Sequence, residues 1–288
     1  MSRPERSLYD KVAEQTASIV IRRYSTSFGL ASRLLEPSVR QQVENIYALV
    51  RIADEIVDGT ALDTLAAGRA LNELETETHL AMDLGYSANL VVHAFALTAR
   101  DVGFGTDLTG PFFESMRMDL TQAVHDQASF DRYVYGSAEV VGLMCLRAFV
   151  RHEALTDEQD ARLVHGARAL GAAFQKVNFL RDLAADYEVL GRSYFPGVDV
   201  AAFSEADKAR LLDDIDSDLR VSGEVIRELP KGSRRAVALA HGLFAELAKR
   251  LRDTPASDLV RSRVRVPNPI KARIALGAAI GGRSGRIR

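Results

Sequence analysis

The sequence of 288 residues contains one cysteine and no tryptophan. Because a disulfide needs two cysteines, the single Cys145 excludes an internal disulfide framework. We expect the Cys145 side chain to pack in the interior, and we expect the protein to occur in a reducing compartment. Residues 1–10 are polar, and no apolar segment typical of a secretory signal follows them. No apolar run reaches the roughly 18 residues that a membrane-spanning helix needs. These absences predict a cytoplasmic protein.

Acidic residues are missing from the end of the chain. Eight Lys and Arg residues and no Asp or Glu occur in residues 261–288, whereas the whole chain has a net charge of −2. The preceding 260 residues therefore carry −10, and this acidic body argues against a general nucleic-acid-binding protein. The basic tail, from about residue 281, is either solvated or contacts phosphates or an anionic membrane surface.

The alternation typical of β-strands is nearly absent, and apolar residues recur instead at three- and four-residue spacing. No change of composition marks a linker. The sequence therefore predicts a single all-α domain over residues 1–288. The expected helices cover residues 9–24, 39–57, 65–84, 90–102, 112–124, 133–150, 157–190, 205–229, 234–251 and 269–280.

Two of these helices carry a pair of aspartates on an otherwise apolar surface. Asp54 and Asp58 are four residues apart, so they share one helix face about 6 Å apart along the axis. Tyr47 and Arg51 continue this stripe, and most other sides of the helix are apolar. Because a helix this apolar is mostly buried, we expect the stripe to face an internal cavity.

The second pair is Asp182 and Asp186, with Gln175 and Asn178 on the same stripe and Arg181 beside it. Buried carboxylates need a cation, because burying them unpaired is costly. Oxygen ligands with spare positions suit Mg²⁺, or Mn²⁺, which binds one or two carboxylates together with substrate phosphates. From the spacing alone, aspartates on a solvent-exposed helix face explain the pattern equally well.

Residues 175–196 read Q-x-x-N-x-x-R-D-x-x-x-D followed by G-R-x-Y-x-P, which resembles the signature of the squalene/phytoene synthase family. Other segments resemble elements of this family in the same order, over about residues 20 to 276. They are residues 24–28, 47–51, 116–120, 133–142 and 263–267 with Lys271. Within the family, the chain looks most like the bacterial phytoene synthases.

The resemblance implies an all-α isoprenoid-synthase fold with a central active-site cavity. It implies catalytic roles for Tyr47, Tyr133, Asp54, Asp58, Asp182 and Asp186. The implied metal ligands are Asp54, Asp58, Asn178, Asp182 and Asp186. Diphosphate binding is implied for Ser25, Ser27, Arg51, Gln175, Asn178, Arg181 and Arg263. The implied prenyl pocket contains Phe28, Ser137, Val141, Gly142, Leu143 and Phe174.

The implied reaction is the head-to-head condensation of two geranylgeranyl diphosphates to phytoene, through a cyclopropyl diphosphate intermediate, in carotenoid biosynthesis. NADPH is not expected for this reaction, and the chain has no G-x-G-x-x-G motif. One alternative is a synthase that makes squalene or dehydrosqualene from farnesyl diphosphate. Another is a non-catalytic relative that serves as an assembly or binding protein. A lipid product implies peripheral contact with the inner face of the membrane.

Four positions depart from the family pattern. Glu55, Val177 and Ser115 stand where Asp, Thr and Gly are frequent in the family. Phe244 is the nearest aromatic residue to the place where a late helix often carries a Tyr, so a role for that hydroxyl is in doubt.

Overall fold

The computed structural model describes residues 6–25, 27–59 and 62–280, apart from the side chains of Ser27, Asp186, Glu188, Val189, Leu190, Ala279 and Ile280. Within these ranges the chain is mostly helical and forms no β-strand, only an isolated parallel bridge between Val124 and Ser193. The helices are α1 (Leu8–Tyr24), α2 (Ser27–Ser32), α3 (Pro37–Asp58), α4 (Thr64–Leu84), α5 (Leu90–Val102), α6 (Thr106–Thr121), α7 (Gln127–Val134), α8 (Val140–Val150), α9 (Asp157–Leu190), α10 (Glu205–Val225), α11 (Lys231–Asp253), α12 (Ala256–Leu259) and α13 (Asn268–Ile280). A π-helical turn, η1 (Tyr135–Glu139), joins α7 to α8, and two 3₁₀ turns are η2 (Val200–Ala202) and η3 (Ile226–Glu228).

The all-α prediction is confirmed, and α5 and α9 begin and end at the predicted residues. The expected helix 112–124 is wrong at both ends, because α6 already begins at Thr106 and stops at Thr121. The interior Gly110 and Pro111 resemble helix breakers in the sequence, yet α6 runs through them. The short helices α2 and α12 were not predicted, because four to six residues are too few to display a helical period.

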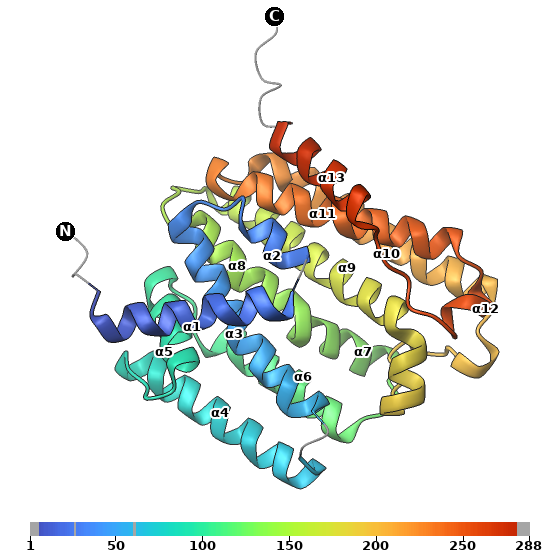
Figure 1. The fold of residues 1–288 in the computed structure, drawn as a ribbon, viewed down its shortest axis with the longest axis horizontal. Helices are drawn as coiled ribbons and strands as arrows, with labels where there is room; N and C mark the ends of the chain where they lie inside the picture. The colour runs from blue at the N-terminus through green and yellow to red at the C-terminus, as the bar shows by residue number, and fades with distance from the viewer. Residues whose placement is uncertain (1–5, 26, 60–61, 281–288) are drawn as a thin grey trace, which may run out of the picture.

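Helix α9, which has 34 residues, runs through the middle of the molecule (Figure 1). Helices α10, α11 and α13 lie on one side of it, and α3 to α6 lie on the other. Two large apolar cores correspond to these sides, one built mainly from α3 to α6 and α8, the other from α9 to α11. The space between them is where a central cavity can form.

Close contact between α9 and the η1–α8 segment depends on glycine. A methyl group on Gly171 would lie 2.5 Å from the Ala138 carbonyl oxygen, and one on Gly142 would lie 2.7 Å from the Ala167 carbonyl oxygen. Both distances are below any ordinary contact, so these two positions let the backbones approach. The two helices therefore form one closely packed wall of the interior.

The continuous helical stretch Gln127–Val150 is long and apolar enough to cross a membrane by length and composition. Half of its most apolar window is buried inside the protein, and it packs against α6 and α9. A core helix of a bundle has the same properties, so this stretch is weak evidence for a membrane span.

Candidate active site

A cavity of about 910 Å³ lies between the two halves of the bundle. Along α9 its lining changes from Leu163 at one end to Asp182 at the other, and along α3 it changes from Val43 to Asp58. Both helices thus turn a stripe of side chains to the cavity, apolar toward their N-termini and ionic toward their C-termini. The result is an elongated apolar space with one charged end.

Most of the predicted site residues line this single cavity. They are Ser25, Phe28, Tyr47, Arg51, Asp54, Asp58, Tyr133, Ser137, Val141, Gly142, Phe174, Gln175, Asn178, Arg181, Asp182 and Arg263. The side chains of Ser27 and Asp186 lie outside the described residues. Leu143 does not line the cavity; it packs in the core of the α3–α6 half. Val141 and Gly142 both line the cavity, and at 100° per residue Leu143 points about 200° away from Val141, toward the opposite side of the helix.

The Asp54 carboxyl group lies at the charged end, with 33% of its side chain still exposed. The pKa of Asp54 is raised to about 7, mainly by burial. The Arg51 guanidinium opposes this increase, and two nearby carboxylates add to it. Arg51 Nη1 is 3.8 Å from Asp54 Oδ2, but its other nitrogen pairs with Glu55, and the guanidinium lies 4.7 Å from the Tyr24 ring centre. Arg51 alone therefore does not neutralise Asp54, and an additional cation would favour the ionised carboxylate.

Asp182, across the cavity, lies between two guanidinium groups. Arg181 Nε is 3.0 Å from Asp182 Oδ1, and Arg263 Nε is 2.7 Å from the same oxygen. Arg263 Nη2 adds a contact of 3.2 Å to Oδ2. Two arginines that come from α9 and from the segment before α13 thus concentrate positive charge where the sequence predicted diphosphate binding, and guanidinium groups suit phosphate oxygens.

Arg192, in the segment after α9, connects the two aspartate-bearing helices. Its Nη1 donates to Asp58 Oδ1 at 2.7 Å and to the Tyr194 hydroxyl at 3.2 Å. Its Nη2 donates to the Val57 carbonyl oxygen at 3.2 Å. One buried side chain therefore holds the last turn of α3 next to the segment that follows α9.

Asp119 of α6 forms the centre of a second polar group at this end. Only 5% of its side chain is exposed, and it accepts hydrogen bonds from the hydroxyls of Tyr133 at 2.7 Å and Tyr194 at 3.0 Å. Burial raises the pKa of Asp119 to about 6, against the lowering effect of Arg192, which is 3.6 Å away, and of the Tyr133 and Tyr194 hydroxyls. The imidazole ring of His125 packs beside both tyrosines, 5.2 Å and 5.8 Å between ring centres.

The motifs containing Asp119, Arg192 and Tyr194 were recognised in the sequence, but these residues were not predicted as site residues. For Asp119 and Arg192 the available signal was a charged residue next to apolar or aromatic neighbours. Periodicity could not show that these two motifs and the segment of Tyr133 meet at one carboxylate.

The position of Tyr133 depends on the π-helical turn η1. The Ser115 hydroxyl donates to the Tyr133 carbonyl oxygen at 3.2 Å, at the point where the regular helix is interrupted. Gly136 lies so close to α6 that a methyl group there would be 2.1 Å from the Pro111 carbonyl oxygen. Single π-turns often occur at functional sites, and this one holds α7 against α6, where Tyr133 reaches Asp119.

Aromatic rings form the wall next to the charged end. Phe174 and Phe244 stack with ring centres 3.8 Å apart, and Phe28 lies 5.6 Å from Phe174. Phe28 is also 6.4 Å from Tyr47, which reaches the charged end. At position 244 the wall therefore presents a stacked hydrocarbon ring and no hydroxyl.

The donor set at the charged end fits a hard divalent cation. Asp54, Asp58, Asn178 and Asp182 offer oxygen ligands to one cavity, and the raised pKa of Asp54 reflects a carboxylate without a full counter-charge. Among the described side chains, no three acidic, His or Cys groups converge on one point. The residues present therefore suit ions that also take oxygens from a bound phosphate, as Mg²⁺ does.

Fold and site together define an all-α protein with the isoprenoid-synthase fold and an elongated cavity whose charged end carries aspartates and arginines. The chain belongs to the squalene/phytoene synthase family, whose profile matches residues 21–269. The predicted family and fold are thereby confirmed.

Known relatives and solved structures agree with this assignment. The chain is 33% identical to phytoene synthase 3 of Zea mays over 205 residues, which is 68% of this chain and 46% of the relative. It is 29% identical to 15-cis-phytoene synthase of a Paracoccus species over 191 residues, 63% of this chain and 59% of the relative. The matches thus span about half the length of these curated relatives.

Solved structures with the same fold include a dehydrosqualene synthase, which superposes with a TM-score of 0.77 at 22% identity, covering 96% of this chain and 98% of that one. The squalene synthase HpnC of Alicyclobacillus acidocaldarius superposes with a TM-score of 0.73 at 19% identity, covering 87% of this chain and 98% of that one.

Proposed function

We propose that the protein condenses two geranylgeranyl diphosphates head to head to form phytoene and two diphosphates. The observation that carries this proposal is the cavity lining, which is ionic at Asp182 and apolar as far as Leu163. These two residues are 19 positions apart on α9, so the lining extends over about 28 Å at 1.5 Å per residue. A diphosphate at the charged end and a chain of several isoprene units in the apolar part match this shape. The names of the relatives, which are phytoene synthases, support the same product.

In the proposed reaction, the first allylic diphosphate leaves, and C1 of its cation bonds to the double bond of the second substrate. Loss of a proton closes a cyclopropane ring that still carries the second diphosphate. That diphosphate then leaves, the cation rearranges, and loss of a second proton gives phytoene. No reductant is consumed, so NADPH is not required.

The chain's own groups have distinct tasks in this scheme. Arg51, Arg181 and Arg263 bind phosphate oxygens and stabilise the charge that develops on the leaving diphosphate. Phe28 and Phe174 provide an apolar wall that keeps water from the cation. Tyr133 is held toward the charged end by its hydrogen bond to Asp119.

We propose that Mg²⁺, or Mn²⁺, is held by Asp54, Asp58, Asn178, Asp182 and Asp186. Bound there, the cation would supply Lewis-acid stabilisation of the departing diphosphate. The raised pKa of Asp54 supports this assignment, because a divalent cation provides the missing counter-charge.

The decisive experiment incubates the protein with geranylgeranyl or farnesyl diphosphate and Mg²⁺, with and without NADPH, and identifies the products by mass spectrometry. Phytoene formed without NADPH is the expected result. Faster conversion of farnesyl diphosphate would favour the squalene or dehydrosqualene alternative. No hydrocarbon from either substrate would overturn the enzymatic proposal and favour a binding or assembly role.

The residues are tested by Asp54→Ala and Asp182→Ala, which should each abolish turnover while the circular dichroism spectrum stays helical. Asp213→Ala is the matched control, since Asp213 lies on the outer surface of α10 with 72% of its side chain exposed. Full activity in both cavity variants would refute the assignment of the aspartates.

We propose that the protein is cytoplasmic and attaches peripherally to the inner face of the membrane. The reason is that substrates with long apolar tails and a hydrocarbon product dissolve in lipid far better than in water.

A further inference from the structure

The outward face of α1 combines apolar and basic side chains. Leu8, Val12 and Ile19 are 79%, 40% and 52% exposed. At 100° per residue these three fall within about 40° of one another, so they form one narrow stripe along the helix. Exposed apolar residues that gather on one face and are rimmed by polar residues mark interaction sites more often than residues scattered singly do.

Three exposed basic residues flank this stripe. Lys11 and Arg22 lie on one edge and Arg23 on the other, and none of them forms an ion pair with an acidic group among the described residues. Arg22 instead donates to the Ser18 carbonyl oxygen of its own helix at 2.9 Å. The three positive charges are therefore available to an external partner.

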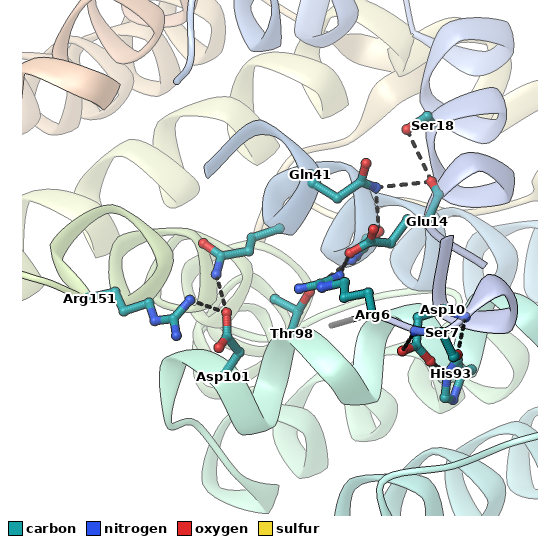
Figure 2. Close-up of polar contacts among 12 residues, drawn as sticks. Arg6, Ser7, Asp10, Glu14, Ser18, Gln41, His93, Thr98, Asp101 and Arg151 are labelled. Carbon is teal, nitrogen blue, oxygen red and sulfur yellow. Dashed lines mark hydrogen bonds and ion pairs between the residues drawn. The ribbon is translucent and has the colours of Figure 1, made fainter. Parts of the chain in front are cut away.

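The acidic residues of α1 point the other way. Asp10 accepts a hydrogen bond from the buried His93 at 2.8 Å, and Glu14 pairs with Arg6 (Figure 2). These contacts lie on the side of α1 that packs against α3 and α5. The outward face thus carries positive charge with no acidic residue among its exposed members, an arrangement typical of helices that lie on anionic membranes.

The same helix leads to the cavity. Ile21 and Tyr24, in its last turn, are part of the cavity lining, as is Phe28 of α2. At the other end of α1, the exposed ring of Tyr86 stacks on Tyr9, which follows Leu8 in the chain, with 5.3 Å between ring centres. A flat partner that covers the outward face of α1 would therefore lie beside one side of the cavity.

We propose that the outward face of α1, defined by Leu8, Lys11, Val12, Ile19, Arg22 and Arg23, docks the protein onto an anionic lipid surface. The choice of lipid rests on the proposed function, because the tails of the substrates and the product partition into membranes. A second copy of the chain fits less well. A twofold interface brings the same patch of both copies together, so the three basic residues would face three basic residues.

The test is co-sedimentation of the full chain with vesicles of phosphatidylcholine, with and without phosphatidylglycerol. Two triple variants address the two parts of the face: Leu8→Ser/Val12→Ser/Ile19→Ser and Lys11→Gln/Arg22→Gln/Arg23→Gln. A basic residue near an anionic membrane contributes about fivefold to binding, so removing three should weaken binding by roughly 100-fold at low salt. The wild-type protein should bind only vesicles with phosphatidylglycerol, and less as salt rises.

Matched controls lie elsewhere on the surface. Leu65→Ser/Leu80→Ser removes two exposed leucines of α4, which are 70% and 55% exposed. Arg210→Gln/Arg220→Gln/Lys249→Gln removes three exposed charges of α10 and α11. Both controls should bind vesicles like the wild type. Circular dichroism confirms that every variant is folded.

Equal binding by the α1 variants and the wild type would overturn the docking proposal, as would equal loss of binding in the controls. A change from dimer to monomer in the α1 variants, measured by light scattering and without loss of vesicle binding, would assign the face to a second copy instead. Synthase activity is measured separately in detergent. The α1 variants should keep it there, so a failure of the proposed function appears as inactive wild-type protein, whatever the vesicles show.

Discussion

Arg192 Nη1 lies 2.7 Å from Asp58 Oδ1, although 134 positions separate the two residues in the chain. This contact joins the end of α3 to the segment after α9. The same guanidinium is 3.6 Å from the buried Asp119 carboxylate. Arg192 therefore pairs with two carboxylates, Asp58 and Asp119, at the charged end of the cavity.

Replacing Arg192 with Met should destabilise the protein by about 3 kcal/mol, because it leaves the buried Asp119 without its cation. Urea unfolding followed by circular dichroism measures this loss. Arg192→Lys keeps the charge but not the two-nitrogen geometry, so its loss should be smaller. If Arg192→Met and the wild type unfold with the same urea midpoint, the stabilising role of Arg192 is contradicted.

Tyr133→Phe removes the hydroxyl that donates to Asp119 at 2.7 Å. We expect about 1 kcal/mol of lost stability and a fall in turnover of about 10², the contribution of a hydroxyl that takes part in proton transfer near the reacting carbons. Tyr135→Phe is the control, because the Tyr135 ring contacts Arg168 on a different side of the helix. The prediction fails if both variants turn over substrate equally fast.

The metal-free protein should lose stability as pH rises from about 4 to 7. Burial raises the pKa of Asp54 from 3.8 to about 7, so the folded state holds this proton more tightly than the unfolded state does. Stability from this group is therefore complete below pH 4 and is lost as pH rises toward 7. Asp54→Asn should remove this part of the pH dependence, worth on the order of 1–2 kcal/mol after allowance for solvent screening.

Thermal unfolding at several pH values, with and without Mg²⁺, measures this effect. Mg²⁺ should stabilise the wild type most at pH 7 and above, where Asp54 is ionised, and should stabilise Asp54→Asn less. The same Mg²⁺-induced shift in both proteins would exclude Asp54 as a ligand.

Gly171→Ala should destabilise the protein by about 1–3 kcal/mol, because its methyl group would lie 2.5 Å from the Ala138 carbonyl oxygen. The wall of the cavity would have to widen, so the yield of product should fall as well. Gly110→Ala, in α6, meets nothing within 4 Å, and it should be neutral or stabilising by up to about 1 kcal/mol. Urea unfolding of the two variants tests the contrast, and equal stabilities would refute it.

Local patterns in the sequence predicted much of the fold and of the site. The apolar spacing of residues 157–190 predicted the bounds of α9, and the four-residue spacing of Asp54 and Asp58 predicted one shared face turned to a cavity. These features depend only on helix geometry and on the cost of burying charge. The Leu143 prediction was wrong because the orientation of a helix within a bundle is not a local property.

The sequence by itself determined most of the helices, the polar stripes of α3 and α9, and the motifs by which the family is recognised. Only the tertiary structure decided that Asp119, Tyr133, Tyr194 and Arg192 share one hydrogen-bonded group, and that Asp182 lies between Arg181 and Arg263. Helical periods repeat within a few residues, so they fix which side chains share a face. Contacts between residues far apart in the chain depend on how whole helices pack, and no local spacing specifies that.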